Sequence, residues 1–161
     1  MALIKVADLG ISSGVNTPAF EAQLSANQDI SDNVYTKVEI DTEVFDTDNC
    51  YDNSTNYRFT PTVAGKYFVY ASIIADVATV NNLEEIRTHI YKNGSSLRGV
   101  VINFSNNDAR LASLGVQAVI SMNGSSDYLE LYARINDTSG NPDISKNSEG
   151  TYFGAYRIIG A

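Results

Sequence analysis

Several residue types are scarce in this chain of 161 residues, and each shortage excludes a class of protein. There is one cysteine, Cys50, so no disulfide can form within the chain, and stability has to come from packing or self-association. The 11 basic residues are outnumbered by 19 acidic ones, and the net charge of −8 disfavours binding to nucleic acid or to anionic membranes. Polar residues interrupt every apolar stretch before the roughly 18–20 residues that a membrane-spanning helix needs. We therefore expect no nucleic-acid partner and no membrane insertion.

The amino-terminal residues differ in character from the rest of the chain. They carry charges inside an apolar stretch and lack the basic start, long apolar middle and small-residue cleavage site of a secretory leader, so we expect no signal peptide. We predict that residues 1–17 form a short attachment arm and that residues 18–161 form a single head domain. The apolar arm residues that would dock onto another protein are Leu3, Ile4, Val6, Leu9 and Ile11.

Apolar residues recur with a period of two along most of the chain, which is typical of β-strands. In the first clear case, Phe20, Ala22 and Leu24 alternate with polar residues. Tight hairpin turns are predicted at Asn93-Gly94 and Asn123-Gly124, because these pairs accept positive φ angles. The expected strands cover residues 20–25, 34–41, 57–61, 66–76, 85–92, 97–104, 112–122, 128–136 and 151–159. This pattern predicts an all-β, antiparallel two-sheet sandwich of about ten strands.

Two of the expected strands, 66–76 and 151–159, are apolar on both faces. A two-sheet sandwich covers one face of each sheet, so the second apolar face implies a covering element or a neighbouring subunit. We infer a self-association face rich in tyrosine, with the alternative that some of these rings lie inside and reach the rim with their hydroxyls. The candidate interface residues are Tyr67, Phe68, Tyr70, Ile74, Tyr128, Tyr132, Tyr152, Phe153 and Tyr156.

Four segments carry a resemblance to a known family. Pro18-Ala-Phe-Glu-Ala-Gln-Leu-Ser25 resembles the opening strand of the globular head of complement subcomponent q. Tyr51 to Pro61, followed by Val63-Ala-Gly-Lys-Tyr-Phe68, is similar to that family's central motif. Ile90-Tyr-Lys-Asn-Gly94 resembles its hairpin, and Thr151-Tyr-Phe-Gly-Ala-Tyr156 resembles its closing strand. The order and spacing agree over roughly residues 18–159.

This resemblance implies the jelly-roll sandwich that the complement q heads share with the tumour necrosis factor ligands, and a compact homotrimer. The chain departs from the family at Asn56-Tyr-Arg58, where the family usually has a glycine, and it has no collagen-like stalk. With no leader recognised, an animal secreted ligand is not expected. The chain instead resembles virion proteins of tailed phages, in which this jelly roll occurs in tail-fibre tips and capsid decorations; this step rests on analogy.

Candidates for catalysis are few. A hydrolase needs a base that is oriented by a carboxylate and aimed at a nucleophile, and no such set surrounds His89, the only histidine. We interpret it as a surface residue on the outward face of its strand. Cys50 lacks the cysteine and histidine spacing of a zinc site, and we interpret it as an incidental thiol. We therefore expect no enzymatic activity.

An acidic stretch, residues 41–52, is the one candidate for a metal site. Asp46, Asp48 and Asp52 could offer oxygen ligands to calcium, and complement-type heads often carry calcium near their apex. The stretch lacks the glycine and terminal glutamate of a helix-loop-helix calcium site. The alternative is a solvated turn without any cofactor.

These observations favour a non-enzymatic virion protein, made in the host cytoplasm and located on the virion surface. Its partners would be its own copies and other virion proteins. The leading hypothesis is a trimeric knob that decorates the capsid through its arm. The first alternative is a receptor-binding tail-fibre tip that uses apical loops at 41–56, 105–111 and 137–149 to recognise host glycan or protein. A soluble lectin-like binding protein is a more distant alternative.

Overall fold

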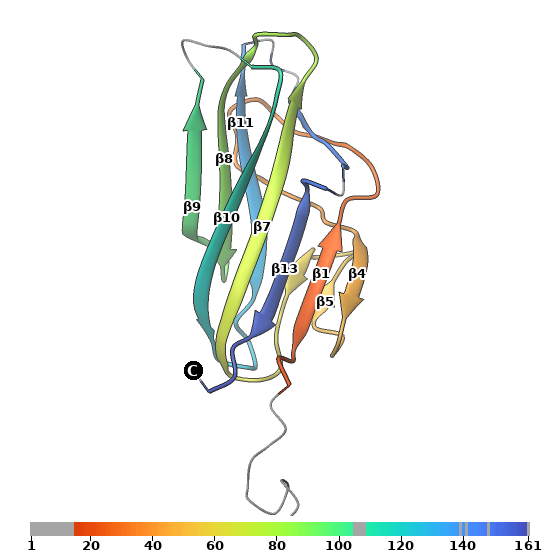
Figure 1. The fold of residues 1–161 in the computed structure, drawn as a ribbon, viewed down its shortest axis with the longest axis vertical. Helices are drawn as coiled ribbons and strands as arrows, with labels where there is room; N and C mark the ends of the chain where they lie inside the picture. The colour runs from red at the N-terminus through yellow and green to blue at the C-terminus, as the bar shows by residue number, and fades with distance from the viewer. Residues whose placement is uncertain (1–14, 105–108, 139, 141, 148, 161) are drawn as a thin grey trace, which may run out of the picture.

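The computed structural model of the chain describes residues 15–104, 109–138, 140, 142–147 and 149–160. These residues form thirteen strands in two antiparallel sheets that lie face to face (Figure 1). The predicted all-β sandwich is confirmed. The strands are β1 (Ala19–Gln23), β2 (Gln28–Asp29), β3 (Thr36–Lys37), β4 (Thr42–Asp46), β5 (Tyr51–Asp52), β6 (Arg58–Phe59), β7 (Gly65–Val77), β8 (Leu83–Lys92), β9 (Ser95–Asn103), β10 (Leu111–Met122), β11 (Leu129–Asp137), β12 (Pro142–Ile144) and β13 (Tyr152–Arg157).

The longest strand, β7, organises the seven-stranded sheet. Along one side it pairs with β10, and along the other it pairs first with β13 and then with β12. Beyond β13 lie β1 and β4, and β2 pairs with β12. In the six-stranded sheet the order is β5, β6, β11, β8 and β9, with β3 also beside β11.

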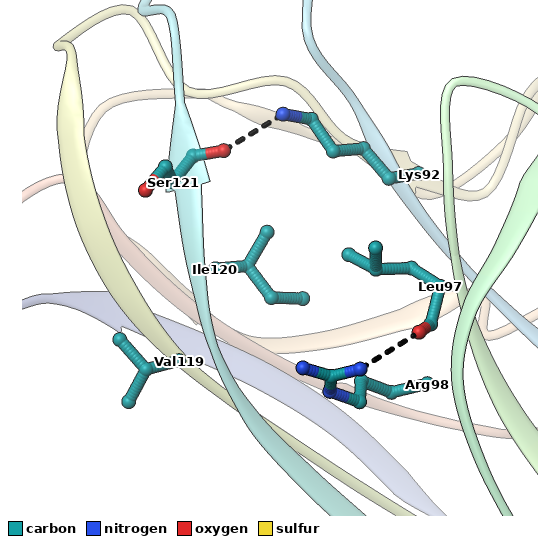
Figure 2. A pocket seen from close by; sticks show the side chains of 6 residues that line it. All are labelled: Lys92, Leu97, Arg98, Val119, Ile120 and Ser121. Carbon is teal, nitrogen blue, oxygen red and sulfur yellow. Dashed lines mark hydrogen bonds between the residues drawn. The ribbon is translucent and has the colours of Figure 1, made fainter.

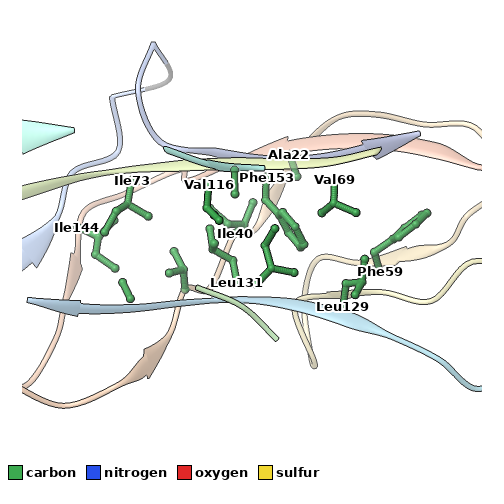
Figure 3. Close-up of a cluster of buried hydrophobic side chains, with 14 of the residues drawn as sticks. Ala22, Ile40, Phe59, Val69, Ile73, Val116, Leu129, Leu131, Ile144 and Phe153 are labelled. Atoms are coloured by element: carbon green, nitrogen blue, oxygen red, sulfur yellow. The ribbon is translucent and has the colours of Figure 1, made fainter. Parts of the chain in front are cut away.

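The core fills the space between the two sheets (Figure 3). Alternate residues of β7 and β13 point inward from one sheet, and alternate residues of β8 and β11 point inward from the other. At one end the ring of Phe20 stacks on Tyr51 and Phe59, both with centroids at 4.5 Å, and meets the edge of Phe153 at 5.1 Å. This aromatic group packs β1 and β13 of one sheet against β5 and β6 of the other. Cys50, next to β5, is also buried in this core.

The two predicted Asn-Gly turns have different roles. Asn93 and Gly94 have φ angles of 52° and 75° and join the paired strands β8 and β9, as a two-residue hairpin requires. Asn123-Gly124 instead carries the chain from β10 in one sheet to β11 in the other, so the prediction of a hairpin there was wrong. A Cβ on Gly124 would lie 2.3 Å from the amide nitrogen of Ala64, so only glycine fits this close backbone contact.

Four strands outside the nine expected ranges explain why thirteen are found instead of about ten. β4 and β5 lie in the acidic stretch that the sequence analysis treated as loop, and β2 and β12 are only two and three residues long. Figure 1 shows β4 beside β1 and β5 in the other sheet behind them, both away from the end of the sandwich where β7 passes into β8. The expectation that 41–56 is an apical loop was therefore wrong. Within the described part of the chain, no helix is long and apolar enough to cross a membrane.

Candidate functional site

The outward face of the seven-stranded sheet carries a cluster of aromatic side chains. Because side chains alternate along a strand, the register between strands places outward residues in rows across the sheet. One row consists of Val119, Phe68, Tyr156 and Ala19. The next row consists of Gln117, Tyr70, Gly154, Glu21 and Phe45. A third row consists of Gly115, Ser72, Tyr152, Gln23 and Thr42.

Four rings form the centre of this surface, which we call the aromatic face: Phe68, Tyr70, Tyr152 and Tyr156. The ring centroids of Phe68 and Tyr156 are 5.5 Å apart, those of Phe68 and Tyr70 are 6.1 Å apart, and those of Tyr70 and Tyr152 are also 6.1 Å apart. These separations are typical of interacting aromatic pairs. The four rings thus form one continuous apolar surface over β7 and β13.

Tyr70 is fixed in orientation by a polar contact. Its hydroxyl donates a hydrogen bond of 2.8 Å to Oε2 of Glu21. Burial, together with this nearby carboxylate, raises the pKa of the Tyr70 hydroxyl. The phenol therefore remains a neutral donor at physiological pH, and the acidic side chain of Glu21 has a partner within the face.

The structure adds two apolar residues to the aromatic face that the sequence analysis missed. Val119 on β10 is 56% exposed beside Phe68, and Phe45 on β4 is 44% exposed beside Glu21. The period of two in residues 112–122 marks Val119 as outward, but a single exposed valine is too common to indicate a site. Phe45 was missed because its strand was not predicted.

Two of the predicted interface residues are buried in the core instead. Tyr67 and Phe153 are both 0% exposed and point between the sheets, because they alternate with Phe68 and Tyr152. The hydroxyl of Tyr67 donates a hydrogen bond of 2.7 Å to the carbonyl oxygen of Val63. The ring is therefore buried in the core while its polar hydroxyl has a partner at the rim. The alternative that some of these tyrosines are inner-face residues is correct for Tyr67.

Two further predicted interface residues, Tyr128 and Tyr132, lie on the other side of the sandwich. Tyr132 is on the outward face of the six-stranded sheet, where its ring stacks on Tyr91 at 4.0 Å. Tyr128 lies under the guanidinium of Arg58, whose Cζ is 4.5 Å from the ring centroid. The grouping of all nine residues on one face was therefore wrong. Phe68, Tyr70, Tyr152 and Tyr156 share the aromatic face, and Ile74 lies on the same side of β7 but is buried, at 8% exposure.

His89 lies on the outward face of the six-stranded sheet and has partners for both ring nitrogens. Nδ1 lies 2.8 Å from Oγ of Ser96, and Nε2 lies 3.3 Å from the hydroxyl oxygen of Tyr35. Burial and the charge of Arg87 lower the pKa of His89. Although a serine is within reach, the second nitrogen faces a phenol rather than a carboxylate. This arrangement is not the one that activates a serine nucleophile.

The three aspartates proposed as calcium ligands stabilise two turns: Asp46 and Asp48 lie at the turn after β4, where the backbone N–H of Asp48 donates to Asp46 at 3.3 Å, and Asp52 lies in the next turn. Asp46 accepts a hydrogen bond from the backbone N–H of Tyr51 at 2.8 Å, and Asp48 accepts one from the hydroxyl of Thr47 at 2.6 Å. Asp52 accepts five hydrogen bonds from residues 54–56. Among the described residues, no group of three histidine, cysteine or acidic side chains is placed to hold a metal ion. In this arrangement each of the three carboxylates is used locally, and the structure does not bring the three candidate ligands together.

An open side of the sandwich lies between β9 and β10, each of which is an edge strand among the described residues. A pocket of about 220 Å³ is lined there by Lys92, Leu97, Arg98, Val119, Ile120 and Ser121 (Figure 2). Leu97 and Ile120 point toward one another across it. The Nζ of Lys92 donates to the carbonyl oxygen of Ser121 at 2.8 Å and closes one end.

The predicted attachment residues Leu3, Ile4, Val6, Leu9 and Ile11 lie outside the described residues.

No family model and no curated protein matches the sequence. Solved structures do match. The chain is similar to murine APRIL at 14% identity and a TM-score of 0.62, over 87% of this chain and 98% of that one. It is similar to an Eiger TNF from S. frugiperda at 12% identity and a TM-score of 0.62, over 89% and 93%. It is also similar to the globular domain of zebrafish complement 1qA at 14% identity and a TM-score of 0.62, over 88% and 97%. The chain therefore has the two-sheet jelly-roll fold of the complement C1q and TNF type.

Proposed function

We propose that the chain is a non-enzymatic jelly-roll head that forms a homotrimer by burying its aromatic face around a threefold axis. The observation that carries this proposal is the row of rings on the outward face of the seven-stranded sheet. In an antiparallel sheet whose outward face is covered by water, the residues on that face are normally polar. A contiguous aromatic surface on a soluble sheet marks an interaction site.

A second copy of the same chain is the simplest partner for this face. The surface is apolar at its centre, and its one central carboxylate, Glu21, is already bonded to Tyr70. When the face is buried around an axis, this carboxylate would therefore keep a hydrogen-bond donor. Closed cyclic symmetry is the usual arrangement of homo-oligomers, and the fold is the one that the resemblance associates with trimers.

We further propose that this trimer is a knob on the surface of a tailed-phage virion that decorates the capsid through residues 1–17. The support is the sequence-level resemblance to virion heads and the apolar character of the arm that precedes β1. Binding only to the assembled shell would stabilise the shell by mass action. Removal of residues 1–17 is expected to abolish binding to capsid shells that lack the protein, while the trimer remains.

A receptor-binding tip is the second candidate, and the outer face of the six-stranded sheet favours it. Tyr35, His89, Tyr91 and Tyr132 would still face outward in the proposed trimer. Aromatic rings beside polar groups suit binding to a glycan or protein on a host cell. In this case the chain without residues 1–17 would keep its binding to host cells, and the full chain would not bind shells.

Light scattering on two variants tests the trimer, and the tyrosines that they replace are equally exposed to solvent. Tyr156 on the aromatic face is 38% exposed, and Tyr35 on the opposite sheet is 37% exposed. The wild-type chain and Tyr35→Asp are expected to have three times the monomer mass, and Tyr156→Asp is expected to dissociate to folded monomers. A monomeric wild type, or a trimeric Tyr156→Asp variant, would contradict the proposal.

A further inference from the structure

The two long edges of the seven-stranded sheet are chemically different. Three strands, β7, β13 and β1, lie between the edge strands β10 and β4, which are therefore four strand spacings or about 19 Å apart. When three copies of such a sheet turn the same face toward one axis, the β4 edge of each copy meets the β10 edge of the next. The contact is head to tail and closes as a ring. The two edges therefore have to be complementary to one another.

The β10 edge, with the neighbouring β9, is apolar and basic. Neither strand contains an aspartate or glutamate, and β9 contains Arg98. Leu97 is 40% exposed and Val119 is 56% exposed. The guanidinium of Arg98 donates a hydrogen bond of 3.4 Å to the carbonyl oxygen of Leu97 and lies at the end of the pocket in Figure 2. It is the charged group best placed to receive an acidic partner.

The β4 edge is apolar and acidic. Residues 38–57 contain six acidic side chains and no lysine or arginine. Within β4, Val44 is 54% exposed and Phe45 is 44% exposed, and the exposed Glu43 precedes them. An exposed apolar pair on an edge strand is an aggregation hazard unless something covers it. This edge thus offers the acidic charge that the other edge lacks, together with apolar residues that can pack against Leu97 and Val119.

We propose that β4 of one copy docks onto the open β9–β10 edge of the next copy, with Val44 and Phe45 against Leu97 and Val119 and with Glu43 beside Arg98. The inference rests on the proposed trimer and specifies which surfaces meet in it. The pocket at this edge, about 220 Å³, is smaller than the roughly 300–1,000 Å³ of most small-molecule sites, so its size favours side chains as occupants. Opposite charges at the two edges also fix one direction around the ring, because like edges would repel one another.

Charge reversal tests the pairing. Glu43→Lys and Arg98→Glu are each expected to raise the concentration at which the trimer half-dissociates by at least tenfold, measured by analytical ultracentrifugation at low salt. The double variant is expected to return within threefold of the wild type, since the pair is restored with its charges exchanged. The control is Glu149→Lys, which makes the same change in net charge as Glu43→Lys at an exposed position outside both edges. Circular dichroism confirms that each variant is folded.

Each outcome separates this inference from the trimer itself. Single variants that match the Glu149→Lys control would overturn the edge pairing and leave the trimer standing. If the trimers of the single variants are weakened and the trimer of the double variant does not recover, the edge pairing would also be overturned. The two residues would then act on different partners. A wild-type chain that is monomeric at all concentrations would overturn the proposed trimer first and the edge pairing with it.

Discussion

The ring of Tyr70 lies directly against the backbone of Gly154, its cross-strand neighbour in the seven-stranded sheet. A Cβ at position 154 would lie 2.4 Å from Cζ and 2.6 Å from the hydroxyl oxygen of Tyr70. Glycine therefore allows the ring to extend across β13 and reach Glu21 on β1. The flat aromatic face depends on the absence of one methyl group.

Gly154→Ala is expected to displace the Tyr70 ring and break its hydrogen bond to Glu21. The added carbon forces a shift in a packed surface, which typically costs about 1–3 kcal/mol in unfolding free energy. Urea unfolding would measure this cost, and light scattering would detect a weakened trimer. Gly115→Ala is the control on the same face, since its Cβ would make only an ordinary contact of 3.4 Å. Equal effects of the two substitutions would contradict the role of Gly154.

Much of the fold could be predicted because alternation along a strand depends on local sequence. The doubly apolar pattern of 66–76 correctly assigned Phe68, Tyr70 and Ile74 to one side of β7. It did not decide which side faces the core, because both sides are apolar and the choice depends on the opposite sheet. For this reason Tyr67 was included in the interface although it is 0% exposed.

The candidate site needed information that no single strand contains. Tyr132 and Tyr152 have similar local patterns, yet they lie on opposite sheets, which depends on how the chain crosses between layers. Phe45 lies in a stretch rich in Asp and Asn, residues that are depleted in strands, and its pairing with β1 overrides that local preference. The complementary edges became visible only when β4 and β10 were placed at opposite sides of one sheet.

Phe20 and Phe45 are expected to respond oppositely to truncation. Phe20 is 0% exposed among three aromatic rings, so Phe20→Ala should cost about 3–5 kcal/mol in unfolding free energy through lost burial and an unfilled cavity. Phe45 is 44% exposed, so Phe45→Ala should leave the unfolding free energy of the monomer within about 0.5 kcal/mol. Phe45→Ala should nevertheless weaken the trimer. Urea titrations at protein concentrations below and above the one at which the trimer forms would separate the effect on monomer stability from the effect on the trimer.

Asp143→Asn is expected to stabilise the protein at neutral pH. Asp143 on β12 faces Asp76 on β7 and Asp29 on β2, with Asn27 and Arg110 also nearby. Burial, followed by the charge of Asp76, raises the pKa of Asp143, so ionisation is less favourable in the folded state than in the unfolded one. Folding stability is then lost as the pH rises above the ordinary value of 3.8. Removing one of the facing like charges should recover roughly 0.2–1 kcal/mol at pH 7.

The gain from Asp143→Asn should disappear below pH 3.8, where the wild-type carboxyl is protonated in both states. Thermal unfolding of both proteins between pH 3 and pH 8 would measure this difference. Asp127→Asn is the control, because Lys92 and Asn93 lower the pKa of Asp127 and its removal should destabilise the protein at pH 7. A pH-independent effect of Asp143→Asn would contradict the explanation by charge.

Asp52→Ala is expected to have the opposite pH dependence, because this carboxylate is stabilised by the folded chain. The backbone N–H of Thr55 donates to it at 2.9 Å and the side-chain amide of Asn56 at 2.6 Å, and these bonds lower its pKa to about 2. The contribution to stability is fully present above the ordinary value of 3.8 and is lost as the pH falls toward 2. At pH 7 the substitution should cost about 1 kcal/mol, at the lower end for bonds to a charged group because water reaches the carboxylate. Urea unfolding of both proteins from pH 7 down to pH 2 should show the two stabilities converging at the acidic end, and a constant difference would mean that Asp52 acts through the shape of the turn and not through its charge.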